Sequence, residues 1–203
     1  MQEPTENKTI SVDDEVLIRR CQRGDLEAME LLIVRYQDRI YNTILKICSN
    51  PEDAAELTQE TFVKVIEKIA TFKGNSSFYT WLFRVGVNLT LTFCKRRQRL
   101  PMQSIDVSMN QADPAGNRLS AYLMCKEKAD PAVLAQDREV REILMQMLDR
   151  LEDDHRTVLI LRDIEGMSYQ EIAQILEVEM GTVKSRISRA RANLKDLLEA
   201  VLA

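Results

Sequence analysis

Histidine and glycine are scarce in this sequence of 203 residues, and the scarcity excludes several kinds of active site. His155 is the single histidine, so a histidine-rich metal site cannot form. The six glycines never stand as G-x-G, so the sequence contains neither a dinucleotide-binding fingerprint nor a phosphate-binding Walker loop. We therefore expect no metal site and no cofactor.

Long apolar runs and closely spaced cysteines are also missing. The longest stretches without a charged residue, 74–83 and 85–94, have ten residues each, whereas a membrane-spanning helix needs about 20 apolar residues. The four cysteines contain no C-x-x-C and fit neither a zinc site nor a dense disulfide framework. The first residues show no signal-peptide pattern. These features predict a cytoplasmic protein that is not inserted in a membrane.

Helical periodicity is what the sequence does contain. Apolar residues recur every three or four positions over 26–47, beginning at Leu26, and Asp25 is placed to cap that helix. Asn50 followed by Pro51 is a strong start signal for the next helix, which we expect to end near residue 70. With 45% hydrophobic residues, the chain has enough apolar side chains for a packed core.

The patterning predicts an all-α fold with two small helical domains. Residues 101–131 are rich in Ser, Asn, Gln, Asp and Pro and show no clean period, as is typical of a flexible linker. We therefore expect a tail at 1–11, a first domain at 12–100, this linker, and a second domain at 132–203.

The second domain contains a helix-turn-helix pattern. Ser168 and Glu171 form a capping box that opens a short helix, residues 177–181 form a turn, and Thr182 is expected to cap a second helix ending near Leu198. Counted at 100° per residue, one narrow stripe of that second helix must face the core: Val183, Ile187, Ala190 and Leu194.

The opposite side of this helix suits the major groove of DNA. Residues 182–195 contain five basic residues and no acidic one. Small hydroxyls with a central arginine can reach base edges, and cations at both margins can reach phosphates. The alternative is a solvated basic face on a bundle helix. Opposite the core stripe lie Ser185, Ser188 and Arg189, flanked by Lys184 and Arg191 on one side and Arg186 on the other.

The first domain carries an acidic face. Glu52, Glu56 and Glu60 are four residues apart and therefore share one side of a helix, with Asp53 and Gln59 beside them. We define Glu52, Glu56 and Glu60 as the acidic face. It is either a docking surface for a basic partner or a solvated surface, and the spacing alone leaves both possibilities open.

Downstream the sign of the charge reverses. Residues 74–105 contain no acid. Aromatic rings among cations are what the binding of unstacked bases requires, although Trp81 stands at core spacing and is expected to be buried. The basic residues of this segment are Arg84, Lys95, Arg96, Arg97 and Arg99, and the aromatic residues in and next to it are Phe72, Phe78, Tyr79, Trp81, Phe83 and Phe93.

These motifs resemble those of a known family. Residues 57–62 (LTQETF) and 72–88 (FKGNSSFYTWLFRVGVN) resemble region 2 of the extracytoplasmic-function (ECF) sigma factors of bacterial RNA polymerase. Residues 165–173 (EGMSYQEIA) and 180–191 (MGTVKSRISRAR) resemble their region 4. One departure is Gly86, which stands where these proteins commonly have alanine. The first domain would then be region 2 and the second region 4.

The resemblance implies a non-enzymatic sigma factor that binds core RNA polymerase, directs it to −35/−10 promoters and assists melting. It also implies contacts with the clamp helices of the largest subunit and with the flap region, and control by an anti-sigma factor. Core-binding residues would be Asp53, Glu56, Leu57, Gln59, Glu60 and Phe62. The −10 element would be bound by Phe72, Lys73, Asn75, Ser76, Arg84, Asn88, Lys95, Arg96 and Arg97, and the −35 element by Thr182, Lys184, Ser185, Arg186, Ser188, Arg189 and Arg191.

Two other interpretations stay open at this point. A stand-alone helix-turn-helix regulator with a helical dimerisation or sensory module fits the second domain but gives the acidic face no purpose. A nucleic-acid enzyme could place Mg²⁺ on the acidic face, but no histidine or lysine neighbours it in sequence to activate a nucleophile.

Overall fold

The computed structural model describes residues 13–99 and 143–202, and within them all regular secondary structure is helical. The all-α prediction is confirmed for this part of the chain. The predicted tail (1–11) and linker (101–131) lie outside the described residues. The described residues form two compact units. The first contains the residues up to Leu89 together with Gln174–Leu176, and the second contains the others, so one division falls inside a long helix, between Leu89 and Thr90. The domain boundaries drawn from the sequence stay a prediction.

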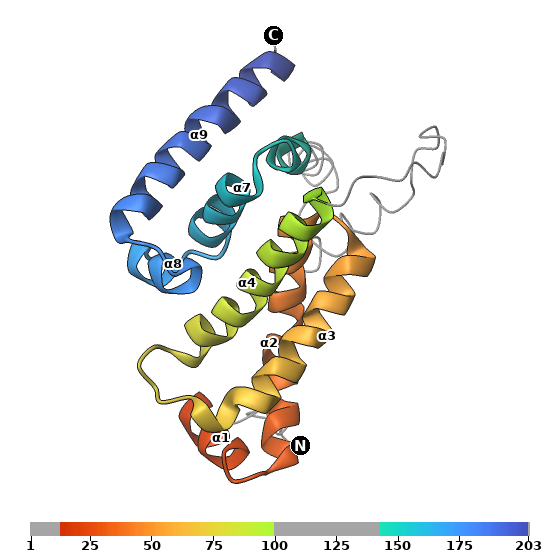
Figure 1. Ribbon diagram of the computed structural model, residues 1–203, viewed down its shortest axis with the longest axis vertical. Helices are drawn as coiled ribbons and strands as arrows, with labels where there is room; N and C mark the ends of the chain where they lie inside the picture. Colours follow the sequence, from red (N-terminus) through yellow and green to blue (C-terminus); the bar gives the residue numbers. More distant parts are fainter. Residues whose placement is uncertain (1–12, 100–142, 203) are drawn as a thin grey trace, which may run out of the picture. The chain divides into compact units, whose positions relative to one another are not determined.

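The first unit is built from four helices, of which the last belongs to it only up to Leu89 (Figure 1), and in it α2 packs against both α1 and α3. They are α1 (Asp14–Cys21), α2 (Leu26–Cys48), α3 (Pro51–Lys68) continued by a 3-10 turn (Ile69–Thr71), and α4 (Phe78–Arg99).

Local capping explains where these helices begin. The Asn50 side chain accepts hydrogen bonds from the backbone N–H groups of Glu52 and Asp53, at 2.9 and 3.0 Å, so it satisfies two of the donors that a helix start leaves unpaired. Asp25 accepts from the Ala28 N–H at 3.2 Å. The Arg20 guanidinium lies 2.7 Å from the Asp25 carboxylate and lowers the pKa of Asp25.

The core of the first unit follows the predicted apolar stripe of α2, with one error. Ile40, Ile44 and Ile47 are at most 1% exposed. Leu26 is 81% exposed, so the expectation that it begins the buried stripe is wrong. It is the first helical residue, where α2 has not yet reached its neighbours.

A close crossing brings α4 onto α3. A Cβ atom added at Gly86 would lie 3.3 Å from the methyl group of Thr61 and 3.7 Å from Ile44. Gly86 therefore lets the two backbones approach more closely than an alanine would. This gives a physical reason for the glycine that departs from the family pattern.

The second unit contains the helix-turn-helix, with α7 packed against α9. The Ser168 hydroxyl accepts from the Glu171 N–H at 3.2 Å, and the Glu171 carboxylate accepts from the Ser168 N–H at 2.8 Å, so the predicted capping box is confirmed. The elements are helical residues 143–149, α7 (Asp153–Leu159), a π-helical turn (Ile160–Ile164), α8 (Tyr169–Leu176) and α9 (Met180–Leu202).

The last helix begins earlier than its sequence suggests. Thr182 lies inside the first turn of α9, and the carbonyl of Glu179 accepts from the N–H groups of Thr182 and Val183 at 2.9 and 3.2 Å. The predicted cap at Thr182 is therefore wrong, and the helix also extends past Leu198 to Leu202. Glu177 takes a left-handed conformation with φ 54° and ends α8, so the intervening turn is shorter than predicted.

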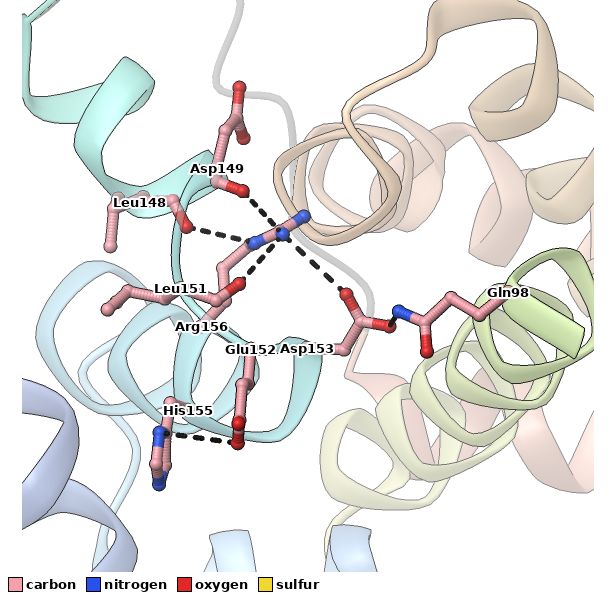
Figure 2. A network of polar contacts seen from close by, with 8 residues as sticks. All are labelled: Gln98, Leu148, Asp149, Leu151, Glu152, Asp153, His155 and Arg156. Carbon is pink, nitrogen blue, oxygen red and sulfur yellow. Dashed lines mark hydrogen bonds and ion pairs between the residues drawn. The ribbon is translucent and has the colours of Figure 1, made fainter.

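A buried arginine holds the entry to this unit together (Figure 2). The Arg156 guanidinium donates to the carbonyl oxygens of Leu148, Asp149 and Leu151 at 2.9–3.0 Å and lies 3.6 Å from the Asp153 carboxylate. Its side chain is 9% exposed. Carbonyls at the end of a helix lack their usual helical partner. Arg156 supplies donors to them, in addition to the Leu151 N–H that donates to the Leu148 carbonyl at 3.1 Å, and it fixes the turn before α7.

Candidate functional site

The acidic face forms as predicted on the outer side of α3. Glu52, Glu56 and Glu60 are exposed, and the carboxylate of Glu60 pairs with Lys64 one turn later at 3.1 Å. Gln59 is exposed beside them, and Asp53 is half-buried in the first turn. Three carboxylates on one helix side make an exposed surface of one sign.

Two residues predicted for this surface lie beneath it. Leu57 is 3% exposed and Phe62 is 8% exposed, so they pack in the core and support α3 from inside. Two apolar residues not expected at the surface, Val63 and Ile66, are 53% and 46% exposed. At 100° per residue, Val63 falls between Glu52 and Glu56 in projection, so a helical projection of the sequence would have placed it on this face.

The loop over residues 72–77 is backed by aromatic rings. The Phe72 ring centroid lies 5.1 Å from that of Trp81 and 5.9 Å from that of Phe78. Trp81 is 8% exposed, which confirms the prediction that it is a core residue. Phe72 itself is half-buried. Of the other loop residues predicted to bind the −10 element, Lys73 and Asn75 are exposed and Ser76 is half-buried.

Sequence reasoning missed the residue that fixes the start of this loop. The Gln22 side-chain amide donates to the carbonyl oxygens of Ile69 and Phe72, at 3.1 and 2.9 Å. Gln22 lies about 50 residues earlier in the chain, just after α1, so nothing local connects it with the loop. The Gln22 amide binds carbonyl oxygens at the end of the 3-10 turn and so fixes the backbone at Phe72, where the loop begins.

The predicted −10 residues of α4 do not share one side of the helix. Arg84 and Asn88 are half-buried and four residues apart, and Lys95 follows seven residues after Asn88, so these three form one row. Arg97 lies nine residues after Asn88, half a turn round, and its guanidinium is 5.9 Å from the Phe93 ring centroid. Arg96 is exposed. Helix geometry thus favours Arg84, Asn88 and Lys95 as a single contact line.

The outer side of α9 matches its prediction. Val183, Ile187 and Ala190 are at most 2% exposed, and Leu194 is half-buried. On the opposite side, Lys184, Ser185, Ser188 and Arg189 are all exposed, and we call these four residues the exposed strip. Thr182 is half-buried at the start of the helix, where its carbonyl accepts from the Ser185 hydroxyl at 3.0 Å.

The two arginines that flank the exposed strip have partners that the sequence did not indicate. Arg191 contacts both carboxylate oxygens of Asp163, at 2.6 and 3.4 Å, and this contact raises the pKa of Arg191. Arg186 lies 3.1 Å from the carboxylate of Asp154. Asp154 belongs to α7 and Asp163 to the π-helical turn after it. Both flanks of the exposed strip are therefore neutralised within the second unit.

Comparison with known proteins assigns both units. Residues 32–100 match the family described as Sigma-70 region 2, and residues 141–194 match Sigma-70, region 4. The chain thus carries the two conserved regions of a sigma-70-type initiation factor in their order along the chain. The acidic face lies within the first matched region and the helix-turn-helix within the second, so one family accounts for both features.

Full-length relatives narrow the class. The chain is 35% identical to the ECF RNA polymerase sigma-E factor of Salmonella typhimurium over 191 residues. The matched residues cover 93% of this chain and 96% of the relative. The protein belongs to the extracytoplasmic-function sigma factors. It is therefore a transcription initiation factor that directs RNA polymerase to promoters, and the stand-alone regulator is not favoured.

Solved structures share the fold. The structure of CnrH in complex with the cytosolic domain of CnrY matches with a TM-score of 0.65 and 24% identity, over 92% of this chain and 97% of that chain. RpoE from Bartonella quintana, solved with the anti-sigma factor NepR, matches with a TM-score of 0.59 and 23% identity, over 84% of this chain and 96% of that chain. Among the helices of the described residues, none is long and apolar enough to span a membrane.

Proposed function

We propose that this sigma factor divides its work among three surfaces: the acidic face binds core RNA polymerase, the 72–77 loop with one row of α4 binds the melted −10 element, and the exposed strip of α9 reads the −35 element. The observation that carries the proposal is the separation of charge by surface. A chain with a net charge of −4 exposes three carboxylates along one side of α3, whereas its residues 74–105 and 182–195 contain no acid.

Polymerase docking is assigned to α3 because its outer side combines charge with apolar area. Glu56 and Gln59 can pair with basic and polar groups on the clamp helices of the polymerase, while Val63 and Ile66 supply exposed apolar surface next to them. Interfaces are stabilised mainly by buried apolar contacts, and rim charges steer association. Leu57 and Phe62 would act indirectly, by holding α3 in place.

Binding of the melted −10 strand is assigned to the loop because it offers an aromatic floor with polar groups above it. A base taken out of the duplex needs a ring to stack on and donors or acceptors along its edge. Phe72 provides the ring, and Lys73, Asn75 and Ser76 provide the polar groups. The row Arg84, Asn88 and Lys95 would continue the contact along α4.

Reading of the −35 element is assigned to α9. Arg189 stands at the centre of the exposed strip and can form two hydrogen bonds with guanine in the major groove. Ser185 and Ser188 are short enough to let the helix approach the bases, and Lys184 can reach a phosphate. Arg186 and Arg191 would reach phosphates only by leaving their aspartates.

Regulation by an anti-sigma factor is part of the proposal. It is supported by the matching RpoE structure, which was solved with its anti-sigma factor NepR. We further propose that the protein has no enzymatic activity of its own and works in the cytoplasm, because its DNA and polymerase partners are located there.

Reconstituted transcription tests the proposal. A promoter mapped from transcript starts after overexpression should give transcripts only when core polymerase and this protein are both present. Scrambling either the −10 or the −35 element should reduce the transcript. Transcription that does not require this protein, or that ignores both elements, would contradict the proposal.

Polymerase binding is tested separately by Glu56→Lys, which reverses one charge of the acidic face. The affinity for core polymerase should fall about tenfold, since a like-charge contact at an interface is costly. Glu30→Lys makes the same change at an exposed site on α2 and should leave the affinity unchanged. Equal affinities of the two variants would mean that the acidic face is only solvated surface.

A further inference from the structure

The α9 surface contains two ion pairs that its proposed function does not require. Arg191 is held by both oxygens of Asp163, and Arg186 is held by Asp154. A guanidinium binds a carboxylate and a DNA phosphate through the same N–H groups. Each aspartate therefore occupies the group that a phosphate would need.

The pairs are confined to the margins of the surface. Within residues 13–99 and 143–202, the structure gives aspartate partners to Arg186 and Arg191 but no ion pair to Lys184 or Arg189. Arg189, which is expected to read bases, is left available, and so is Lys184, whereas the two flanking arginines expected to hold phosphates are occupied. The side chains of Arg191 and Asp163 are 53% and 44% exposed, so DNA could reach this pair without unfolding of the unit.

Such a pair lowers DNA affinity in two ways. The arginine must leave its aspartate before it can bind a phosphate, so the gain from the new contact is reduced by the loss of the old one. The aspartate that remains then lies beside the phosphate and repels it. An exposed ion pair contributes little to folding stability, so stability alone gives little reason for the Arg191–Asp163 pair.

We propose that Asp163 and Asp154 act as internal competitors of the DNA backbone, so that the second unit holds DNA weakly until other contacts bring it to a promoter. The inference rests on the proposed function of α9. Affinity for promoter DNA would then come mainly from base contacts of the exposed strip and from the polymerase that links both units. Contact with arbitrary DNA would stay weak and short-lived.

Binding of the full-length chain to a mixed-sequence DNA duplex tests the proposal, because no promoter sequence is needed. Fluorescence anisotropy should be measured from about 50 to 200 mM NaCl, a range over which each phosphate contact changes the affinity about three- to fourfold. Asp163→Asn keeps the shape of the side chain and removes its charge. It should tighten binding about three- to tenfold at the lowest salt and steepen the slope of log K against log salt by about 0.9, the value for one added phosphate contact.

Two control variants separate competition from a general charge effect. Asp196→Asn removes the same charge from an exposed position of α9 for which the described residues show no ion pair, and it should change the affinity less than twofold. In the Arg191→Ala background, Asp163→Asn should lose the slope change of about 0.9 and keep only the smaller gain that comes from reduced repulsion of the phosphate. Asp154 lies 3.1 Å from Arg186 and 3.8 Å from the Lys95 Nζ. Asp154→Asn should therefore also tighten binding, and the part of the gain that is lost in the Arg186→Ala background is the part that acts through Arg186.

Three results would overturn the inference: weaker or unchanged binding by Asp163→Asn, an equal gain from Asp196→Asn, or a gain of undiminished size without Arg191. Weaker binding would mean that Asp163 positions Arg191 for DNA. Lys184→Ala, measured in the same experiment, keeps the two proposals apart, because Lys184 is the phosphate-contacting residue of the exposed strip. If Lys184→Ala does not weaken binding, α9 is not the DNA surface and both proposals fail. If it does and Asp163→Asn has no effect, only the competition fails.

Discussion

The two proposed DNA-binding surfaces of this protein are built in different ways. The 72–77 loop takes its shape from several elements, since Gln22 after α1 holds its first carbonyls and rings of α4 lie behind Phe72. The exposed strip lies on α9 alone, and the helical period decides which of its side chains face outward. One surface is a product of packing and the other of a single helix.

The difference predicts how each surface fails. Packing against a neighbouring element stabilises a helix, but the helical period alone determines which of its side chains face outward. Loss of support should therefore reduce the folded fraction of the second unit without altering the chemistry of the exposed strip. Loss of support under the loop should alter its binding chemistry with little change in stability.

The largest expected effect comes from removing the support of the second unit. Arg156→Ala removes the guanidinium from three carbonyl groups and from the Asp153 carboxylate, which is 14% exposed. The Leu148 carbonyl keeps the Leu151 N–H, and Asp153 keeps the Gln98 amide. It should destabilise the unit by about 3 kcal/mol, as measured by urea unfolding of the full chain. Molecules that remain folded at low temperature should keep their preference for the −35 element.

Arg150→Ala is the matched control, because Arg150 is exposed near the same turn. Its effect should be below about 0.5 kcal/mol. A loss of −35 preference in folded Arg156→Ala would mean that the exposed strip also depends on packing. The contrast between the exposed strip and the 72–77 loop would then be wrong.

A smaller effect is expected at the crossing of α3 and α4. Gly86→Ala gains about 0.5–1 kcal/mol of helix stability but crowds the buried Thr61 methyl, and overpacking costs about 1–3 kcal/mol. Because the Thr61 hydroxyl donates to the Leu57 carbonyl at 2.7 Å, the methyl cannot move aside easily. We expect a net loss of about 1 kcal/mol in urea unfolding.

The Thr61→Ser background removes the crowded methyl group. There Gly86→Ala should be neutral or stabilising, and this coupling is what a double-mutant cycle measures. If Gly86→Ala stabilises the protein that retains Thr61, the crossing is looser than the 3.3 Å approach indicates.

The smallest effect on stability is expected under the loop. Gln22→Ala leaves two carbonyls near solvent, so the free energy of unfolding should fall by less than about 1 kcal/mol. Because the loop is then less pre-organised, −10-dependent transcription should fall about two- to fivefold. Gln37→Ala, at an exposed position of α2, should change neither quantity. An unchanged −10 dependence would make the Gln22 contact merely structural.

Features determined by neighbouring residues could be predicted from the sequence. The Asn50 cap, the Ser168 capping box and the buried stripe of α9 need only a few adjacent positions, and all three formed as expected. The cap at Thr182 and the burial of Leu26 were wrong because both lie at helix ends, where tertiary contacts decide the outcome.

Features that join distant parts of the chain could not be predicted. Gln22 reaches residues about 50 positions away, and Asp163 meets Arg191 across 28 positions. Charge pattern alone therefore counted Arg191 as available for phosphate. Leu57 was assigned to the polymerase interface by resemblance, and only its 3% exposure shows that it supports that surface from beneath.

The most direct test of the three-surface account is transcription by Arg189→Ala on two templates, one with an intact −35 element and one with that element scrambled. The account predicts that the variant loses transcription on the intact template down to the level of the scrambled one, loses nothing further on the scrambled template, and binds core polymerase normally. An equal proportional loss on both templates would show that α9 does not read the −35 element, and would contradict the account.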